Sequence, residues 1–278
     1  MGNKAEDKDF IGRFREIVSD PLNLVIRRDP RAGYVDGQYV FLHNGLKVQA
    51  TGPLAYYGNF SLILAINRGV HEPLEEYVFQ ELISILPEAP TMLELGAYWG
   101  HYSMWLKTAR PAASVHLVEA DPNGLNVGKH NFILNAMQWE FTCAFVGKNQ
   151  FQVDSYLQEK GIQTLDILHS DIQGYELEML SGCSQTLKNQ RADYLFISTH
   201  SQELHRSVCE KLNQFDYRIE VSSDVENDTT SFDGFVFASS PKKNPVFSNF
   251  SPMGRTKIET ASPQQLINYT AGLINNSP

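Results

Sequence analysis

Acidic residues and glycines at the ends of two apolar segments have the spacing of a nucleoside site. Glu94 ends one apolar segment, and Gly96 and Gly100 follow it, four positions apart. A second apolar segment ends at Glu119. In a parallel sheet, the carboxyl ends of neighbouring strands open onto a crevice in which nucleotides bind. The pattern therefore predicts a nucleoside site in which Glu119 accepts hydrogen bonds from the ribose hydroxyls.

The residue at position 94 distinguishes between cofactors. A dinucleotide site has a glycine there, because the pyrophosphate lies against the helix N-terminus. A carboxylate repels phosphate but suits a cation, so Glu94 favours S-adenosyl-L-methionine over NAD. A tight strand-to-helix turn, with glycines for geometry alone, is the simpler alternative. The expected cofactor contacts at these two strand ends are Glu94, Gly96, Ala97, Tyr98, Gly100, Glu119 and Ala120.

Two more titratable residues end apolar segments further along the chain. Asp171 follows segment 165–170, and His200 follows segment 194–199. Neighbouring strand ends can bring such side chains to one point. His200 is the candidate general base, since its unperturbed pKa is about 6.5, although a strand-end histidine bonded to a nearby loop is an equal alternative. Asp171 could orient His200, contact the cofactor ammonium group or bind a metal.

Other side chains near these positions could form a substrate pocket or complete a metal site. Asp171 and His200 offer mixed oxygen and nitrogen ligands for a divalent ion acting as a Lewis acid, so a metal stays open. His169 lies two positions before Asp171 and so leaves the same face of the strand. His169, His205 and Tyr57 are the residues expected to line the substrate pocket.

Two further acids have a simpler structural explanation. Glu176 falls in the first turn of an expected helix, where an acid interacts favourably with the helix dipole. Asp233 precedes Gly234 at the start of the last expected strand, so a turn accounts for it as well as a role in closing the pocket floor.

The elements that must hold these residues alternate between strand and helix. Strands are expected at 91–95, 115–119, 140–146, 165–170 and 194–199, and helices at 99–109, 123–136, 174–189 and 203–215. Short apolar strands separated by amphipathic helices indicate a parallel sheet that is covered on both faces. Segments 217–221 and 232–238 follow each other without a helix, so these two strands are expected to pair antiparallel if they are adjacent.

The regions on either side of this alternation have a different character. We expect an N-terminal arm with a β-hairpin cap over residues 1–70, in which Asn44 and Gly45 form the turn. The catalytic domain is expected at 71–240, and a C-terminal tail with a short helix at 241–278.

Composition limits the classes of partner. A formal net charge of −9 argues against a nucleic-acid backbone as the main partner. The three cysteines are an odd set without the spacing of metal ligands, and each is expected to pack as a small buried hydrophobe. This favours a reducing compartment. The chain begins with polar residues, unlike a signal peptide, and its longest apolar run, 62–66, is too short to span a membrane. We therefore expect a cytoplasmic protein without membrane contact, and a homo-oligomer stays open.

Four stretches of the sequence carry a family resemblance: 93–100, 118–123 with Asn131 and Asn135, 153–157, and 165–182. In these stretches the chain resembles the FkbM-type S-adenosylmethionine-dependent methyltransferases over roughly residues 69–240. The block from Leu165 to Gly182, with Asp171, Gly174 and Glu176, is the most specific. The family also places Asp171 beside the transferred methyl group, which makes it both a catalytic and a cofactor-binding candidate.

The resemblance implies an α/β fold with a Rossmann-like class I methyltransferase sheet, mostly parallel, of seven strands with the last antiparallel and helices on both faces. It also implies methyl transfer to a hydroxyl of a sugar, glycan or small natural-product-like molecule. His169 stands where the family has lysine, and Gln173 where it has glutamate, and these departures bear on the substrate class rather than on the reaction.

Other functions remain compatible with the sequence. An amine acceptor on the same fold needs less help from a base, and it predicts that His200→Ala retains most activity. A non-catalytic methyltransferase-like binding protein is disfavoured because Glu94, Glu119 and Asp171 are all present. An NAD-dependent oxidoreductase is disfavoured by Glu94.

Overall fold

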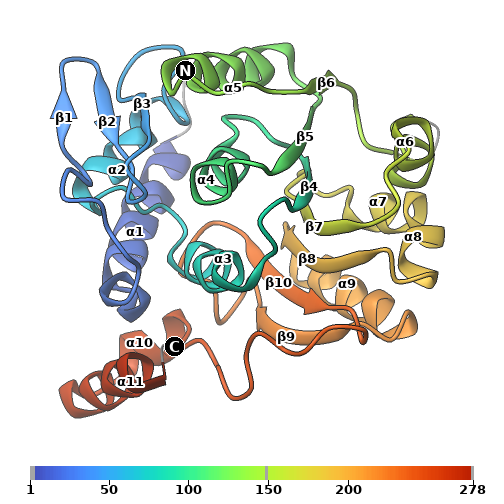
Figure 1. The fold of residues 1–278 in the computed structure, drawn as a ribbon. Coiled ribbons are helices and arrows are strands. Elements are labelled where there is room, and N and C mark those ends of the chain that lie inside the picture. Colours follow the sequence, from blue (N-terminus) through green and yellow to red (C-terminus); the bar gives the residue numbers. More distant parts are fainter. Residues whose placement is uncertain (1–3, 148–149, 277–278) are drawn as a thin grey trace. The chain divides into compact units, whose positions relative to one another are not determined.

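The computed structural model describes residues 4–147 and 150–276, and the chain divides into two compact units (Figure 1). Unit 1 comprises Met1–Glu81, Glu226–Phe232 and Ser251–Pro278, and unit 2 comprises Leu82–Val225 and Asp233–Phe250. The candidate residues from Glu94 to His205 therefore lie in unit 2, whereas Tyr57 lies in unit 1. Among the described residues, no helix combines the length and the apolar character needed to cross a membrane.

Unit 2 is built on a seven-stranded sheet. Its strands are β4 (Thr91–Leu95), β5 (Ser114–Glu119), β6 (Phe141–Cys143), β7 (Leu165–Ser170), β8 (Ala192–Thr199), β9 (Arg218–Ser223) and β10 (Gly234–Ser239). The order is β6-β5-β4-β7-β8-β10-β9, and β10 runs antiparallel to both of its neighbours. This confirms the predicted Rossmann-like class I methyltransferase sheet, including its single antiparallel strand.

Helices cover both faces of this sheet, as the apolar strands require. Figure 1 shows α4 (His101–Ala109) and α5 (Pro122–Leu134) on one face, and α6 (Val153–Lys160), α7 (Glu176–Gly182), α8 (Ser184–Lys188) and α9 (Gln202–Gln214) on the other. All eight residues of β8 are buried. The core under the second group of helices joins strand residues such as Leu95 and Ile197 to helix residues such as Leu157 and Leu180.

Three elements differ from the sequence prediction. The helix expected at 174–189 is interrupted at Cys183, and the carboxylate of Asp154 explains the interruption. Its oxygens accept hydrogen bonds from the backbone N–H groups of Gln185 and Thr186, both at 2.8 Å, and so cap α8 separately. Asp154 itself belongs to α6, a helix that the strand–helix alternation did not include. The strand expected at 140–146 is limited to β6.

Unit 1 contains a small sheet and several helices. Its elements are α1 (Lys4–Ser19), η1 (Pro21–Leu24), β1 (Val35–Asp36), β2 (Tyr39–Phe41), β3 (Lys47–Gln49), η2 (Gly58–Ser61), α2 (Leu62–Ile66), most of α3 (Pro73–Ile85), α10 (Arg255–Thr260) and α11 (Pro263–Asn276). Strands β2 and β3 pair antiparallel, and Gly45 in their turn has a φ of +83°. The predicted hairpin is thus confirmed.

Candidate active site

The loop between β4 and α4 is shaped by close contacts within the protein. Gly96 and Gly100 have φ angles of +72° and +73°, in the region that favours glycine. A Cβ on Gly96 would lie 1.7 Å from the carbonyl oxygen of Asp171, and one on Gly100 would lie 2.7 Å from the ring of Phe132. The loop therefore needs both glycines even before a ligand is considered. The contact also places the end of β4 directly against Asp171 at the end of β7.

Glu94 is buried beneath this loop and is held by the first turns of α4. Its carboxylate accepts hydrogen bonds from the backbone N–H of Ser103 at 3.1 Å and from the Ser103 hydroxyl. Burial raises the pKa of Glu94 above its ordinary value. A cation placed beside Glu94 would offset the cost of burying its charge, so the location suits the ammonium group expected from the sequence. The hydrogen bonds from Ser103 to Glu94 had no signal in the sequence.

Glu119 stands at the end of β5 in an orientation fixed by the backbone. Its Oε2 accepts from the N–H of Tyr98 at 2.8 Å, and its Oε1 accepts from the N–H of Asp121 at 2.7 Å. Each oxygen retains a second lone pair that could accept from a ribose hydroxyl. Tyr98 has a φ of +39°, a strained conformation for a bulky residue, and such strain clusters at ligand sites. Of the other two expected cofactor contacts, Ala97 is buried and Ala120 is exposed.

The second group of candidate residues centres on His200, at the end of β8. The Nε2 atom of its ring lies 3.1 Å from Oδ1 of Asp171 and 3.5 Å from Oδ1 of Asp233. The Nδ1 atom lies 2.8 Å from Oε1 of Glu176. The structure therefore brings Asp171 and His200 together and adds two carboxylates to them. Below, Asp171, Glu176, His200 and Asp233 are called the strand-end cluster.

The charges of this cluster change the protonation of its histidine. Burial by itself lowers the pKa of His200, but the hydrogen bonds to Asp171 and Glu176 and the charge of Asp233 outweigh it and raise the pKa to about 10. In the absence of a ligand, the ring is then protonated at neutral pH. A protonated imidazole cannot accept a proton, so the role of His200 as general base, which stays a prediction, requires the ring to lose this proton first.

Asp233 reaches the cluster through the antiparallel pairing of the last strand. Gly234 of β10 stands opposite Thr199 of β8, so the residue before Gly234 meets the residue after Thr199. The sequence contained a signal for this contact, because strand 232–238 placed antiparallel beside strand 194–199 brings Asp233 to His200. The contact with Glu176 had no such signal, since it depends on how α7 begins after the loop that follows β7.

That loop also carries Gln173, a residue with a φ of +55°. Its Nε2 lies 2.9 Å from Nε2 of His200 and 3.2 Å from Oδ1 of Asp171. The oxygen and nitrogen of an amide can exchange places by a half-turn of the side chain. The Gln173 amide can therefore offer either a donor or an acceptor to the cluster.

Two of the three expected pocket residues are buried in unit 2, and the third is an exposed residue of unit 1. The His169 ring is buried between Tyr102 and Phe196, with ring centroids 4.5 and 6.0 Å away. His205 is buried too, with Nδ1 2.9 Å from the Thr199 hydroxyl and Nε2 2.8 Å from a serine hydroxyl on β9. Tyr57 is an exposed residue of unit 1. The substrate-pocket assignment of all three stays a prediction.

An exposed aromatic pair follows strands β6 and β7, and it was not predicted from the sequence. Phe145 follows β6 and Tyr175 follows β7, and their rings meet edge to face with centroids 4.5 Å apart. Both side chains are exposed. Aromatic faces in such a place can stack against a planar or ring-shaped ligand.

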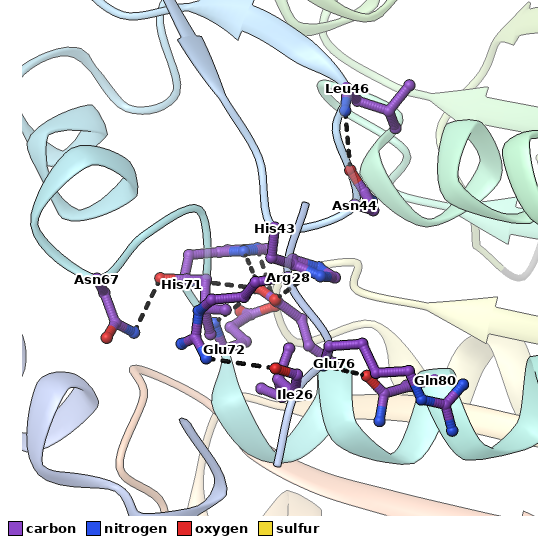
Figure 2. Close-up of polar contacts among 12 residues, drawn as sticks. Ile26, Arg28, His43, Asn44, Leu46, Asn67, His71, Glu72, Glu76 and Gln80 are labelled. Atoms are coloured by element: carbon purple, nitrogen blue, oxygen red, sulfur yellow. Dashed lines mark hydrogen bonds and ion pairs between the residues drawn. The ribbon is translucent and has the colours of Figure 1, made fainter. Parts of the chain in front are cut away.

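Unit 1 contains a second group of histidines and carboxylates, in which the ion pairs are buried (Figure 2). Glu76 of α3 lies between two histidines, with Oε2 2.9 Å from Nε2 of His43 and Oε1 2.5 Å from Nδ1 of His71. Nε2 of His71 lies 3.2 Å from Glu72. Glu72 and Glu76 overcome the effect of burial and raise the pKa of His71 to about 10. We call His43, His71, Glu72 and Glu76 the α3 cluster.

Comparison with known proteins bears on the central part of unit 2. Residues 144–219 match the family model described as the methyltransferase FkbM domain. This confirms the FkbM resemblance over a segment that contains β7, β8, Asp171, Glu176 and His200. The match to the FkbM domain, together with the sheet described above, supports an S-adenosylmethionine-dependent methyltransferase. The loop at Glu94 and the acid Glu119 lie outside the matched segment. Comparison with curated proteins found no match.

Several solved structures are similar to this chain at low sequence identity. A precorrin-6y C5,15-methyltransferase from Geobacter metallireducens is 15% identical, covers 59% of this chain and 89% of its own, and gives a TM-score of 0.45. A SAM-dependent methyltransferase from Aquifex aeolicus is 16% identical, with coverages of 59% and 88% and a TM-score of 0.42. M. capricolum TrmK in complex with S-adenosyl-homocysteine is 14% identical, with coverages of 72% and 83% and a TM-score of 0.40.

Proposed function

We propose that this chain is an S-adenosylmethionine-dependent O-methyltransferase that acts on a hydroxyl of a glycan or small natural-product-like molecule. The observation that carries the proposal is the contact between the two strand ends. Gly96, in the loop between β4 and α4, lies against the backbone of Asp171. The Asp171 side chain belongs to the strand-end cluster. A cofactor bound over the loop would therefore present its reactive end to titratable groups that can act on an acceptor.

The cofactor contacts divide between two acids. Glu119, oriented by Tyr98 and Asp121, is assigned to the ribose hydroxyls. Glu94, buried and held by Ser103, is assigned to the ammonium group of the methionine moiety. Ala97, Gly100 and Ala120 contribute the surrounding backbone. This assignment gives each acid a partner whose charge or hydrogen-bonding groups match it.

The strand-end cluster supplies the proton acceptor. In the reaction, the hydroxyl oxygen attacks the methyl carbon and the carbon–sulfur bond breaks with its electron pair on sulfur, leaving S-adenosylhomocysteine. The hydroxyl proton must leave as the new bond forms. Asp171 and Asp233 are partly exposed carboxylates and can accept it, whereas His200 holds its own proton between them and orients their oxygens.

The acceptor approaches beside exposed aromatic rings. Phe145 and Tyr175 provide apolar faces at the ends of β6 and β7, and sugar rings and planar natural products both bind to such faces. An amine acceptor is the alternative within the same fold. A neutral amine loses its proton only after methyl transfer, so the alternative predicts little dependence of the rate on Asp171 and Asp233.

Two measurements test this function. Calorimetry with S-adenosylmethionine and S-adenosylhomocysteine should show one site per chain, and transfer of a labelled methyl group should be detectable when glycans and hydroxylated small molecules are screened as acceptors. Exposed Glu178 on α7 offers a control, since Glu178→Gln should change neither result. The proposal fails if neither cofactor binds to the folded protein. Methyl transfer to amines alone would support the methyltransferase assignment and refute the hydroxyl acceptor.

A further inference from the structure

Three side chains of the strand-end cluster present ligand atoms at the spacing of a metal site. Asp171, His200 and Asp233 each offer one oxygen or nitrogen atom, and these atoms all lie within 4.8 Å of one another. The two distances from Nε2 of His200 are 3.1 and 3.5 Å. Neighbouring ligands around an octahedral ion with bonds of about 2.1 Å are about 3 Å apart. The three atoms can thus occupy one face of an octahedron after small adjustments.

Glu176 provides a second, independent indication of a cation. It is fully buried, and its Oε1 accepts hydrogen bonds from Nδ1 of His200 at 2.8 Å and from the N–H of Gly174 at 3.2 Å. This fixes the ring so that Nε2 points to the two aspartates, as carboxylates do behind metal-bound histidines. Among the described residues, Oε2 of Glu176 has no hydrogen-bond partner. A buried carboxylate in that state is stabilised by a positive charge nearby, and a cation bound at Nε2 would supply that charge in place of the proton on the His200 ring.

The ligand types of the cluster point in the same direction. Three carboxyl groups surround one imidazole, so oxygen atoms outnumber nitrogen atoms, as a hard divalent cation prefers. Partial exposure of Asp171 and Asp233 leaves room for further ligands on the open side, including an acceptor oxygen. The Gln173 amide is within reach of His200 and can turn its oxygen toward the same point.

We propose that Asp171, His200 and Asp233 bind one divalent cation of the Mg²⁺ or Mn²⁺ type, through one oxygen of each aspartate and Nε2 of the histidine, with Glu176 as the positioning residue. Two oxygen ligands and one nitrogen, with open positions, favour these ions over Zn²⁺, which prefers a tetrahedral set rich in nitrogen and sulfur. This inference rests on the proposed function in assigning the cation a role, which is to hold and polarise the acceptor hydroxyl. With the cation bound, Nε2 of His200 coordinates it in place of the proton that this nitrogen otherwise holds between the aspartates. The second oxygen of either aspartate would still accept the proton of the hydroxyl.

Mn²⁺ provides a direct probe, because its electron paramagnetic resonance signal in solution falls when the ion binds to protein. Titration of the full chain should show one Mn²⁺ per chain, and added Mg²⁺ should compete for it. Asp233→Asn should raise the Kd by about 10-fold or more, and Glu176→Gln by about 10- to 100-fold, which is the usual effect of losing the carboxylate behind a ligating histidine. The controls Asp216→Asn and Glu178→Gln carry the same chemical changes at exposed positions and should bind Mn²⁺ like the unchanged protein.

Binding of S-adenosylhomocysteine, measured on the same samples, separates this inference from the proposed function. Retained cofactor binding without Mn²⁺ binding, or Mn²⁺ binding that is equal in Asp233→Asn and Asp216→Asn, overturns the metal site alone. Mn²⁺ binding without cofactor binding supports the metal site and overturns the methyltransferase assignment. If Asp233→Asn does not fold, as judged by circular dichroism, the comparison of Glu176→Gln with Glu178→Gln decides the question.

Discussion

The strand-end cluster and the α3 cluster use the same chemistry in different surroundings. In each, carboxylates surround a histidine and raise its pKa to about 10. In the α3 cluster, the side chains of His71 and Glu76 are 2% and 0% exposed, whereas Asp171 and Asp233 of the strand-end cluster are 30% and 23% exposed. A strongly raised pKa therefore does not by itself distinguish a binding site from a structural ion pair. The distinguishing property is whether the carboxylates retain an open side that a ligand can reach.

The largest expected effect concerns the strand-end cluster and the rate of methyl transfer. Asp171→Asn keeps the shape of the side chain but removes its charge and its ability to accept a proton. Loss of a general base lowers rates by about 100- to 10,000-fold. Because Asp233 can still accept the proton, a loss in that range is expected for Asp171→Asn combined with Asp233→Asn, and a smaller loss for Asp171→Asn alone. The measurement is single-turnover transfer from labelled S-adenosylmethionine, with Asp216→Asn as the matched control.

The same variant tests whether this cluster also supports the fold. Because Asp171 is partly exposed, Asp171→Asn should change the free energy of unfolding by about 1 kcal/mol or less. A large loss of stability would show that the two clusters do not differ as described. A rate of the double variant close to that of the control would instead favour the amine acceptor.

The next largest effect concerns the α3 cluster and the stability of the folded protein. Glu76→Gln leaves two buried histidines without the carboxylate that lies between them. Removing one partner of a buried pair costs about 3–5 kcal/mol, so urea denaturation followed by circular dichroism should show a loss of that size. Asp36→Asn, at an exposed position in unit 1, is the control and should be nearly neutral. A stability equal to that of the control would mean that the α3 cluster adds nothing to the fold.

The pH dependence of stability also tests whether the α3 cluster stabilises the folded protein. The folded-state pKa of His71, about 10, lies above its ordinary value of 6.5, so its contribution is complete below about pH 6.5 and is lost as the pH rises through 10. Burial alone would raise the pKa of Glu76, but His43 and His71 hold it well below 4.5. The contribution of Glu76 is thus present above pH 4.5 and lost in stronger acid.

The difference in unfolding free energy between the unchanged protein and Glu76→Gln isolates this cluster from other titrating groups. Glu72 and Arg28 also act electrostatically on its members and are unchanged in the variant. The difference should be larger at pH 6.5 than at pH 10.5. An equal difference at the two pH values would show that the protonation of His71 does not stabilise the folded state.

The sheet was predictable from the sequence because its signal is local. The four central parallel strands, β4, β5, β7 and β8, each end at or next to an acid or a histidine. The strand–helix alternation specifies their parallel pairing. The break in the helix at Cys183 was not predictable, since it depends on a cap from Asp154, about 30 residues earlier in the chain. Local propensity carries no information about such a partner.

The same distinction applies to the site. Strand ends identified Asp171 and His200, and strand pairing would have identified Asp233 had the order β8-β10-β9 been applied to it. For Glu176 the sequence predicts only a helix-dipole role, because its contact with His200 arises from tertiary packing. The grouping of the α3 cluster is not predictable for the same reason, as His43 and Glu76 come from separate elements of unit 1.

The smallest expected effect concerns the cofactor end of the open site. Glu119→Gln keeps an oxygen for one ribose hydroxyl but loses the negative charge and one acceptor. A hydrogen bond to a charged group contributes about 1.5–3 kcal/mol, so S-adenosylhomocysteine should bind roughly 10- to 100-fold more weakly by calorimetry. The variant also weakens the support of the strained Tyr98 backbone, so a thermal melt without ligand should accompany the titration. Weaker binding with an unchanged melt would assign Glu119 to the ribose, whereas a lowered melt with unchanged affinity would assign it to the loop alone.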